Sequence, residues 1–446
     1  MEFYFSYFCQ LKFKEIEHVF FKNIKKIGLF VFITSTLASF GTYPTKNDTL
    51  QNMTHKKTAS EILGNPKYQA ICYGGFRKNT REIEPTISEL KEDLRILDAA
   101  GINVLRTYNT HYKEAANLLQ AISELQADNP NFEMYVMLGI WIDCQNAWTS
   151  SEPNHDAEST TANTAEVQRA VDLANKYPHI VKILAVGNEA MVKWAASYYV
   201  QPNVILKWVN HLQTLKKEGK LNRDVWITSS DNFASWGGGD SLYHCNDLEN
   251  LIKAVDYVSL HTYPMHDTHY NPIFWGTLES ELHLPKTEAL ERAMTRAVLY
   301  AKKQYATSKL YIHSIDSTKP IHIGETGWAS SSDGLYGPNG SKACDEYKEG
   351  LYYKMMRDWT DSIGISCFYF EAFNEQWKDA QHLGGSENHF GLFKINGEAK
   401  FALWELVDKK AFEGLTRNGN TIKKTYQGNF DLLLKDVDLP STKQLK

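Results

Sequence analysis

Short apolar runs alternate with longer segments of helical periodicity along the chain from residue 67 onward. Eight of these runs are rich in β-branched and aromatic residues and are too short for helices, which predicts strands. Their apolar character is continuous rather than alternating, as is typical of parallel strands covered on both faces. The predicted strands are Tyr68–Tyr73, Asn103–Thr107, Tyr135–Ile140, Val181–Val186, Val225–Ser229, Asp256–Leu260, Ile321–Gly324 and Ile365–Phe370.

Amphipathic helical patterns fall between the predicted strands. The first, Glu84–Ala100, has Pro85 near its start and Gly101 just past its end, an asymmetry expected of helix termini. The other predicted helices are Glu114–Leu125, Ala165–Lys176, Val204–Lys217, Asn246–Ala254, Thr287–Lys303, Asp345–Ser362 and Phe401–Lys410.

Eight strand–helix units without a sequence repeat predict an α/β fold of the (β/α)8 TIM barrel class. We expect one domain over residues 67–415 and a C-terminal extension over residues 416–446. A Rossmann fold would need a GxGxxG motif after the first strand, but Gly74 and Gly75 are followed by Phe76 and Arg77.

The first 41 residues are unlike the rest of the chain. Lys22, Lys25 and Lys26 directly precede the apolar run Ile27–Phe40, which ends among small residues. This layout predicts a secretory signal peptide, because the run is short for a membrane span. The aromatic-rich lead Met1–Phe21 leaves an uncleaved N-terminal membrane anchor as the alternative. Residues 42–66 are polar and are interpreted as a linker. We therefore expect a secreted, periplasmic or cell-surface protein.

Composition excludes several functional classes. The formal net charge of -5 gives no electrostatic reason to bind nucleic acid. The six cysteines form no CxxC pair, so we predict no metal site and no cofactor. Cys72 and Cys367 are interpreted as buried free thiols, whereas a bridge from Cys344 to Cys144 or to Cys245 stays open. The 11 Trp, 24 Tyr and 21 Phe would suit a core or a sugar-binding cleft.

Reactive groups in a TIM barrel lie where the strands end and the following loops begin. Here those positions carry carboxylates, amides and aromatic rings, with no phosphate-binding loop. In chain order they are Tyr73, Arg106, Tyr108, Trp141, Asp143, Asn188, Glu189, Asp231, Asn232, His261, Tyr263, Glu325, Trp328, Glu371 and Trp377.

Glu189 and Glu325 follow the fourth and seventh strands, which lie across the barrel mouth from each other. Two facing carboxylates suit cleavage of a glycosidic bond, in which one donates a proton and the other attacks the anomeric carbon. A lone glutamate at a strand end is as well explained by a structural hydrogen bond. A pair in matched positions favours catalysis.

The segments around these glutamates resemble a known family. Ile183–Ala190 reads ILAVGNEA and Ile323–Ser330 reads IGETGWAS. Together with the segments Tyr73–Gly74, Arg106–Tyr108, Phe370–Lys378 and Phe390–Phe393, they are similar to glycoside hydrolase family 17, the β-1,3-glucanase family. The resemblance covers residues 68–410. Two departures concern loop shape: Ala329 replaces a common proline, and FEAFNEQWK lacks the usual aspartate and proline.

The resemblance implies roles for individual residues. Glu189 would be the general acid/base, with a pKa raised by its site, and Glu325 the nucleophile. Asn188 would hold the sugar 2-hydroxyl, and Tyr263 would donate a hydrogen bond to the nucleophile. The remaining expected substrate-binding residues are Tyr73, Arg106, Tyr108, Trp328, Glu371 and Trp377.

Several of these residues have structural alternatives. Trp328 could belong to the core, and Glu371, Trp377 and Lys378 could support a loop. Arg106 could be a structural ion-pair partner. The polar insert at residues 143–164 could be a cleft wall or a solvated loop.

The implied function is retaining, endo-acting hydrolysis of a laminarin-like β-1,3-glucan through a glucosyl-enzyme, by a monomer whose partner is the polysaccharide. A β-1,3-glucanosyltransferase using the same site is the alternative. A non-catalytic glucan-binding protein is a third hypothesis, but it would require that one of the two glutamates be replaced.

Overall fold

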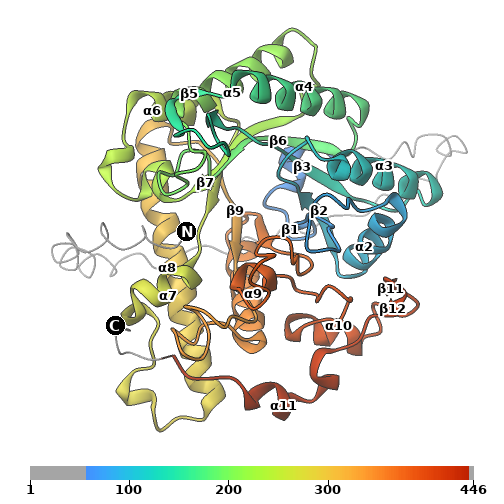
Figure 1. Ribbon diagram of the computed structural model, residues 1–446, viewed down its shortest axis with the longest axis vertical. Coiled ribbons are helices and arrows are strands. Elements are labelled where there is room, and N and C mark those ends of the chain that lie inside the picture. The colour runs from blue at the N-terminus through green and yellow to red at the C-terminus, as the bar shows by residue number, and fades with distance from the viewer. Residues whose placement is uncertain (1–56, 441–446) are drawn as a thin grey trace, which may run out of the picture. The chain divides into compact units, whose positions relative to one another are not determined.

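Eight parallel strands close into a barrel in the computed structural model, which describes residues 57–440 (Figure 1). Each strand pairs with the next barrel strand along the chain, and the last pairs with the first. The predicted (β/α)8 fold is therefore confirmed. The barrel strands are β1 (Gln69–Cys72), β2 (Ile102–Arg106), β3 (Tyr135–Ile140), β6 (Val181–Asn188), β7 (Trp226–Asn232), β8 (Val258–His261), β9 (Ile321–Gly327) and β10 (Cys367–Phe370).

The barrel strands are buried along almost their whole length, as their continuous apolar sequences predicted. Strand β6 runs two residues further than expected, to Asn188, and strands β7 and β9 run three residues further, to Asn232 and Gly327. These added residues include Asn188, Asp231 and Glu325, because the strands end in the polar groups of the site. Polarity hid those strand ends from an apolar pattern.

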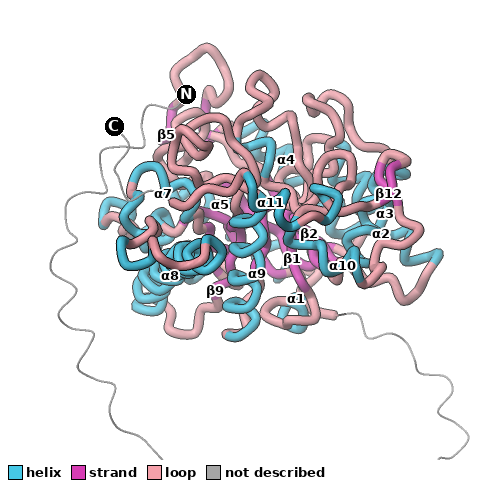
Figure 2. Tube along the Cα trace, turned by 90° about the horizontal axis from the view of Figure 1, so that it is seen from below, coloured by secondary structure: helices cyan, strands magenta, loops and turns pink. Residues whose placement is uncertain are grey.

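Helices surround the strands and cover the outer face of the barrel (Figures 1 and 2). Helix α2 begins after Thr86, whose hydroxyl accepts from the Glu89 amide while the Glu89 carboxylate accepts from the Thr86 amide. The helix is followed by Gly101 at φ 76°, as the Gly position predicted. The helices are α1 (Ala59–Ile62), α2 (Ile87–Ala99), α3 (Lys113–Asp128), α4 (Thr160–Lys176), α5 (Pro202–Lys217), α6 (Asn246–Ala254), α7 (Pro264–Tyr270), α8 (Lys286–Ile315), α9 (Glu346–Ser362), α10 (Trp404–Asp408) and α11 (Phe430–Lys435).

The packed unit begins before the expected boundary at residue 67. Ala59 and Ile62 of α1 are buried in the main core, and the Gly64 amide donates to Ser366 Oγ at 2.8 Å just before β10. The last part of the expected linker is thus folded against the end of the barrel where strands begin. The apolar run Ile27–Phe40 and the rest of the linker lie outside the described residues.

The C-terminal segment also packs on the barrel rather than extending from it. A two-stranded hairpin, β11 (Thr416–Arg417) and β12 (Asn420–Thr421), places Arg417 in a fully buried ion pair with Asp93. Leu433 and Val437 join a small second core that includes Leu290. Within the described residues, the packed unit runs from Thr58 to Pro440, beyond the expected limit at residue 415.

The cysteines of the described part of the chain are all free thiols, so neither bridge considered for Cys344 is formed. Cys72 and Cys367 are buried, as predicted. Within residues 57–440, no helix is long and apolar enough to cross a membrane.

Candidate active site

Glu325 lies near the end of β9 with its carboxylate held on several sides. The Arg106 guanidinium pairs with Oε2, and the Tyr263 hydroxyl donates to Oε1 at 2.6 Å. The Tyr108 hydroxyl contributes a longer contact of 3.4 Å to Oε2. Burial alone would raise the pKa of Glu325, but His261, Arg106 and Tyr263 outweigh burial and lower that pKa to about 2. Glu325 is therefore an anion at neutral pH.

Arg106 connects Glu325 to Asn188. Besides its ion pair, it donates from Nη1 to the Gly324 carbonyl at 3.0 Å and from Nη2 to Asn188 Oδ1. Its guanidinium carbon lies 4.7 Å from the centre of the Tyr108 ring. Arg106 is buried and does not line the cleft, so the expectation that it binds substrate is wrong. It is an ion-pair partner, and the carboxylate that it pairs with is the expected nucleophile. Asn188 also lines the cleft.

Glu189 follows β6 in a left-handed backbone conformation, at φ 45°. A non-glycine residue rarely adopts this conformation, and such strain clusters at functional sites. The Glu189 amide donates to the Ser230 carbonyl at 3.0 Å. Two residues further along, the Met191 amide donates to Asp231 Oδ2 at 2.7 Å. Two hydrogen bonds therefore hold the turn that carries Glu189 against strand β7.

His261, at the end of β8, brings the two glutamates together. Its Nδ1 lies 3.1 Å from Glu189 Oε1 and 3.7 Å from Glu325 Oε2. The two carboxylate oxygens are therefore no further apart than the sum of these distances. That bound is compatible with the roughly 5–5.5 Å separation of carboxyl groups in retaining glycosidases. The imidazole is fully buried and its Nε2 contacts Ser230 Oγ at 2.7 Å, which fixes the ring.

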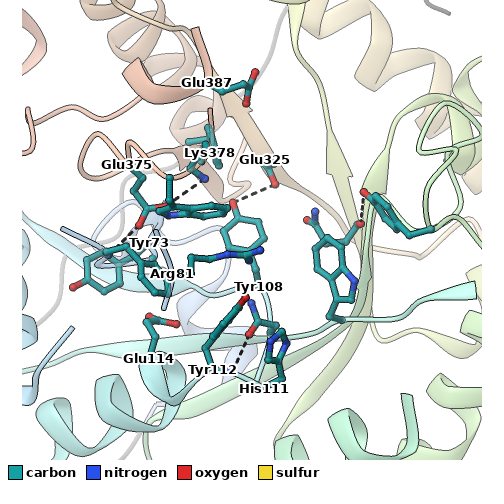
Figure 3. Close-up of a pocket in the computed structure, with 18 of the residues that line it drawn as sticks. Tyr73, Arg81, Tyr108, His111, Tyr112, Glu114, Glu325, Glu375, Lys378 and Glu387 are labelled. Atoms are coloured by element: carbon teal, nitrogen blue, oxygen red, sulfur yellow. Dashed lines mark hydrogen bonds and ion pairs between the residues drawn. The ribbon is translucent and has the colours of Figure 1, made fainter. Parts of the chain in front are cut away.

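Glu325 lines a cleft of about 710 Å³ at the C-terminal ends of the barrel strands, a size that suits a ligand of several rings. Glu189 is not a lining residue, but it directly follows Asn188, which is. In Figure 3, Tyr108 points toward Glu325, and Glu375, Arg81 and Tyr112 gather on one side of them. The cleft is lined by Tyr73, Gly74, Phe76, Arg81, Tyr108, Asn109, His111, Tyr112, Glu114, Trp141, Asp143, Trp148, Asn188, Tyr198, Glu325, Phe370, Glu375, Trp377, Lys378 and Glu387.

One arm of the cleft is built around Trp377, in the segment after β10. The Arg81 guanidinium lies 4.2 Å from its ring centre, and Phe76 packs edge-on at 5.9 Å. Lys378, beside it, lies between the carboxylates of Glu371 and Glu375 at 3.3 and 3.4 Å. Trp377 thus lines the cleft with Arg81 over its ring, and its contact with sugar stays a prediction.

The other arm is built by the insert at residues 143–164. The insert folds as a hairpin of β4 (Cys144–Gln145) and β5 (Asn154–Glu158) followed by the start of α4. Asp143 and Trp148 from this segment line the cleft. The insert is therefore a cleft wall, the first of the two interpretations left open by its sequence.

Trp328 is not part of the cleft, so the expectation that it binds sugar is wrong. Its side chain is completely buried, its indole donates to the Ala343 carbonyl at 2.8 Å, and Trp275 and Tyr352 pack against its ring. These aromatic neighbours come from distant segments of the chain.

Glu371 and Tyr73 are displaced from the direct sugar contact expected for them. Glu371 is buried beneath Lys378 and does not line the cleft, and burial raises its pKa well above the usual range. Tyr73 lines the cleft, but its hydroxyl turns inward to donate to Asp93 at 3.0 Å. Both residues thus support the groups around the cleft. Tyr263 likewise acts through Glu325 rather than as a lining residue.

The sequence pointed to some site residues without assigning them. His261, Trp141 and Asp143 were recognised at strand ends, but nothing local indicated that His261 would join both glutamates. Arg81, Tyr112, Trp148 and Tyr198 lie in loops away from the strand ends, and only their aromatic or cationic character could have suggested them. Among the described residues, no cluster of histidine, cysteine and carboxylate side chains could hold a metal ion.

Comparisons with known proteins agree with this geometry. A family model described as the BtgE/BtgC glycoside hydrolase domain matches residues 70–391. The putative glucan endo-1,3-beta-glucosidase btgC of Aspergillus niger is 22% identical over 312 residues, which are 68% of this chain and 37% of that protein. A glucan 1,3-beta-glucosidase of Arthroderma benhamiae is 26% identical over 332 residues, covering 72% of this chain and 86% of that protein.

Solved structures are similar as well. An endo-laminarinase from Formosa Hel1_33_131 is 60% identical, with a TM-score of 0.86 over 87% of this chain and 99% of that chain. The glycoside hydrolase family 17 beta-1,3-glucanosyltransferase from Rhizomucor miehei is 18% identical, with a TM-score of 0.50 over 75% of this chain and 96% of that chain. At this lower identity the likeness concerns the fold alone.

Proposed function

The chain belongs to the BtgE/BtgC glycoside hydrolase family, and we propose that it hydrolyses β-1,3 linkages within laminarin-like glucan, with retention of anomeric configuration. The observation that carries this proposal is the meeting of Glu189 and Glu325 at one imidazole, with Glu325 held as an anion. The similarity to a Formosa endo-laminarinase supports the choice of substrate and of internal cleavage.

Glu325 acts as the nucleophile in this proposal. Its carboxylate oxygen attacks the anomeric carbon and forms a glucosyl ester as the bond to the leaving oxygen breaks. Arg106 and Tyr263 keep the carboxylate ionised and aimed before attack. Asn188 lines the cleft beside Glu325, where its side-chain amide would bind a sugar hydroxyl.

Glu189 acts as the acid and then as the base. It donates its proton to the leaving oxygen in the first step and accepts a proton from the attacking water in the second. Water then releases the sugar from Glu325. Each of the two steps inverts the anomeric carbon, so the configuration is retained overall. His261 holds the Glu189 carboxylate in place through the contact at Nδ1.

Transfer to a second glucan is the alternative outcome at the same glucosyl-enzyme. One observation favours it, namely the aromatic surface that Trp141, Trp148 and Tyr198 form beside Asn188, where an acceptor sugar could bind. Hydrolysis and transfer differ only in whether water or a sugar hydroxyl attacks.

The test is digestion of laminarin by the full chain, with Glu325→Gln and Glu189→Gln as paired controls. We expect short β-1,3 oligomers whose new reducing ends first appear in the β configuration by proton NMR, and loss of these products in both variants. Products longer than an oligomeric substrate would identify transfer. Intact laminarin and intact β-1,3 oligomers after digestion by the wild type would contradict the proposal.

We further propose that the protein is exported and works as a monomer, with any membrane attachment through residues 1–41. The apolar run Ile27–Phe40, with lysines directly before it, supports the proposal of export. Cell fractionation and light scattering of the secreted form would test these two points.

A further inference from the structure

Trp148 is held in an unusual position at the tip of the insert hairpin. Its side chain is 62% exposed, although it is the largest apolar side chain of the segment. Its backbone is left-handed at φ 61°, and Asn146 nearby is left-handed at φ 65°. A large side chain rarely adopts this conformation, and strain of this kind is associated with function.

The Trp148 ring is oriented by two contacts. It stacks on Tyr198 with ring centres 5.2 Å apart and an interplanar angle of 22°. Its indole Nε1 donates to Asp143 Oδ1 at 2.9 Å, and Trp141 Nε1 donates to the same oxygen at 2.7 Å. One carboxylate therefore fixes two indoles, and Trp148 is preorganised despite its exposure.

The hairpin that carries Trp148 is itself anchored to the barrel. His155 stacks on Tyr199 at 3.6 Å, and its Nδ1 lies 2.8 Å from the Tyr199 carbonyl oxygen. At the hairpin's end, Glu158 accepts a hydrogen bond from Trp208 Nε1 at 2.7 Å and pairs with Lys207. The second strand of the hairpin is thus held against the barrel.

Trp148 lies on the Glu189 side of the cleft. The Tyr198 hydroxyl, beneath Trp148, donates to the carbonyl of Asn188 at 3.4 Å, directly before Glu189. Tyr198 is also close enough to Glu189 that burial and then this carboxylate raise the pKa of its hydroxyl. A general acid protonates the leaving oxygen, so the departing sugar lies on the side of Glu189. Trp377 and Arg81 occupy the opposite arm.

We propose that Trp148 is the platform for the sugar on the leaving-group side, and that it sets the partition of the glucosyl-enzyme between water and a sugar acceptor. This inference rests on the proposed function. A flat ring held in place offers the apolar face on which a pyranose stacks. The same surface that stabilises a leaving sugar also retains an acceptor sugar for the reverse attack.

The experiment compares full-length wild type, Trp148→Ala and Trp148→Phe on β-1,3-linked glucose hexamers labelled at the reducing end. In Trp148→Ala, binding modes that need the platform weaken, so cleavage shifts toward the reducing end. At high hexamer concentration, transfer products fall about three- to tenfold relative to hydrolysis, the range expected for one lost aromatic contact. Trp148→Phe keeps a flat ring and restores part of the pattern.

Trp377→Ala is the matched control, because it removes an indole from the opposite arm and should shift cleavage the other way. Melting temperatures of all variants confirm that each is folded. An unchanged pattern in Trp148→Ala, or a shift toward the non-reducing end, overturns the inference while the proposed function stands. If the wild type cleaves no β-1,3 oligomer, the proposed function fails and this inference fails with it.

Discussion

The hydroxyl of Tyr263 donates a hydrogen bond of 2.6 Å to Oε1 of Glu325. Burial and the adjacent Glu325 carboxylate raise the pKa of Tyr263 well above its ordinary value, so the phenol is protonated and can donate at neutral pH. The bond favours the ionised form of Glu325 over the neutral form. Tyr263 therefore shapes the reaction without touching the sugar.

Replacing Tyr263 with phenylalanine should move the acidic limb of the kcat/KM profile to higher pH. Glu325 must be ionised to attack, and its pKa, about 2 in the native site, rises toward its usual value when a stabilising donor is lost. Activity then falls away at a higher pH than in the wild type. The measurement is hydrolysis of β-1,3 oligomers between pH 3 and pH 7.

Tyr108→Phe is the control for that experiment. Its hydroxyl reaches the same carboxylate at the longer distance of 3.4 Å, so its removal should shift the limb less. An equal shift in both variants would assign the effect to a general change in the cleft rather than to the short Tyr263 bond.

Azide should distinguish the roles of the two glutamates. With an aryl β-glucoside oligomer that has a good leaving group, Glu325→Ala should yield an α-glycosyl azide, because the anion replaces the nucleophile. Glu189→Ala should yield a β-glycosyl azide, because the anion attacks the ester on Glu325 without needing a base. The configuration of each product is read by NMR. A β-glycosyl azide from Glu325→Ala and an α-glycosyl azide from Glu189→Ala would make Glu189 the nucleophile and Glu325 the acid/base.

Trp328→Ala should affect stability rather than substrate binding. The buried indole packs against Trp275 and Tyr352, and its removal should lower the unfolding free energy by about 3–5 kcal/mol. Urea unfolding measures this loss, and KM for laminarin, taken well below the melting temperature, should stay unchanged. A large rise in KM with normal stability would contradict this structural role and show that Trp328 contributes to sugar binding.

Lys400 and Glu349 form a buried ion pair of 3.0 Å between helix α9 and the segment after β10. Lys400 also donates to Ser330 Oγ and the His389 carbonyl, at 2.6 and 2.9 Å, which joins the loops that follow β9 and β10. Lys400→Met should lower the unfolding free energy by about 3–5 kcal/mol, because it leaves Glu349 buried and unpaired.

Adding Glu349→Leu to Lys400→Met should recover much of that loss, since two apolar groups leave no buried charge. The double-mutant cycle in urea gives the coupling energy. Additive losses in the double variant would show that the pair itself matters less than the packing of each side chain.

The barrel could be predicted from the sequence because buried parallel strands are continuous apolar runs. The bounds of Tyr135–Ile140 agree to the residue. The resemblance to glycoside hydrolase family 17 is confirmed by the comparisons. It could be seen in the sequence because its motifs are contiguous residues at strand ends. Short elements were missed, including the hairpin β11–β12 and helix α1, because two to four residues carry no readable period.

Side-chain partners were harder to predict, because they come from distant parts of the chain. His261 contacts Glu189 across 72 positions of sequence, and Trp328 meets Trp275 in the core. The sequence placed each residue near a strand end, but the direction of the chain after the strand decided which of them reached the cleft. Asp143 illustrates the same point, since its two indole partners became visible only in the folded insert.

The Asp93–Arg417 pair has a practical meaning for anyone who clones this gene. Asp93 also accepts hydrogen bonds from Arg77 and Tyr73. Through Asp93, the hairpin that carries Arg417 is therefore connected to Tyr73, which lines the cleft. A protein truncated after residue 415, beyond the last predicted helix, would lack Arg417. The buried Asp93 carboxylate would then lose this ion-pair partner. The shortest insert worth making therefore runs past Val437, the last apolar residue of the second core.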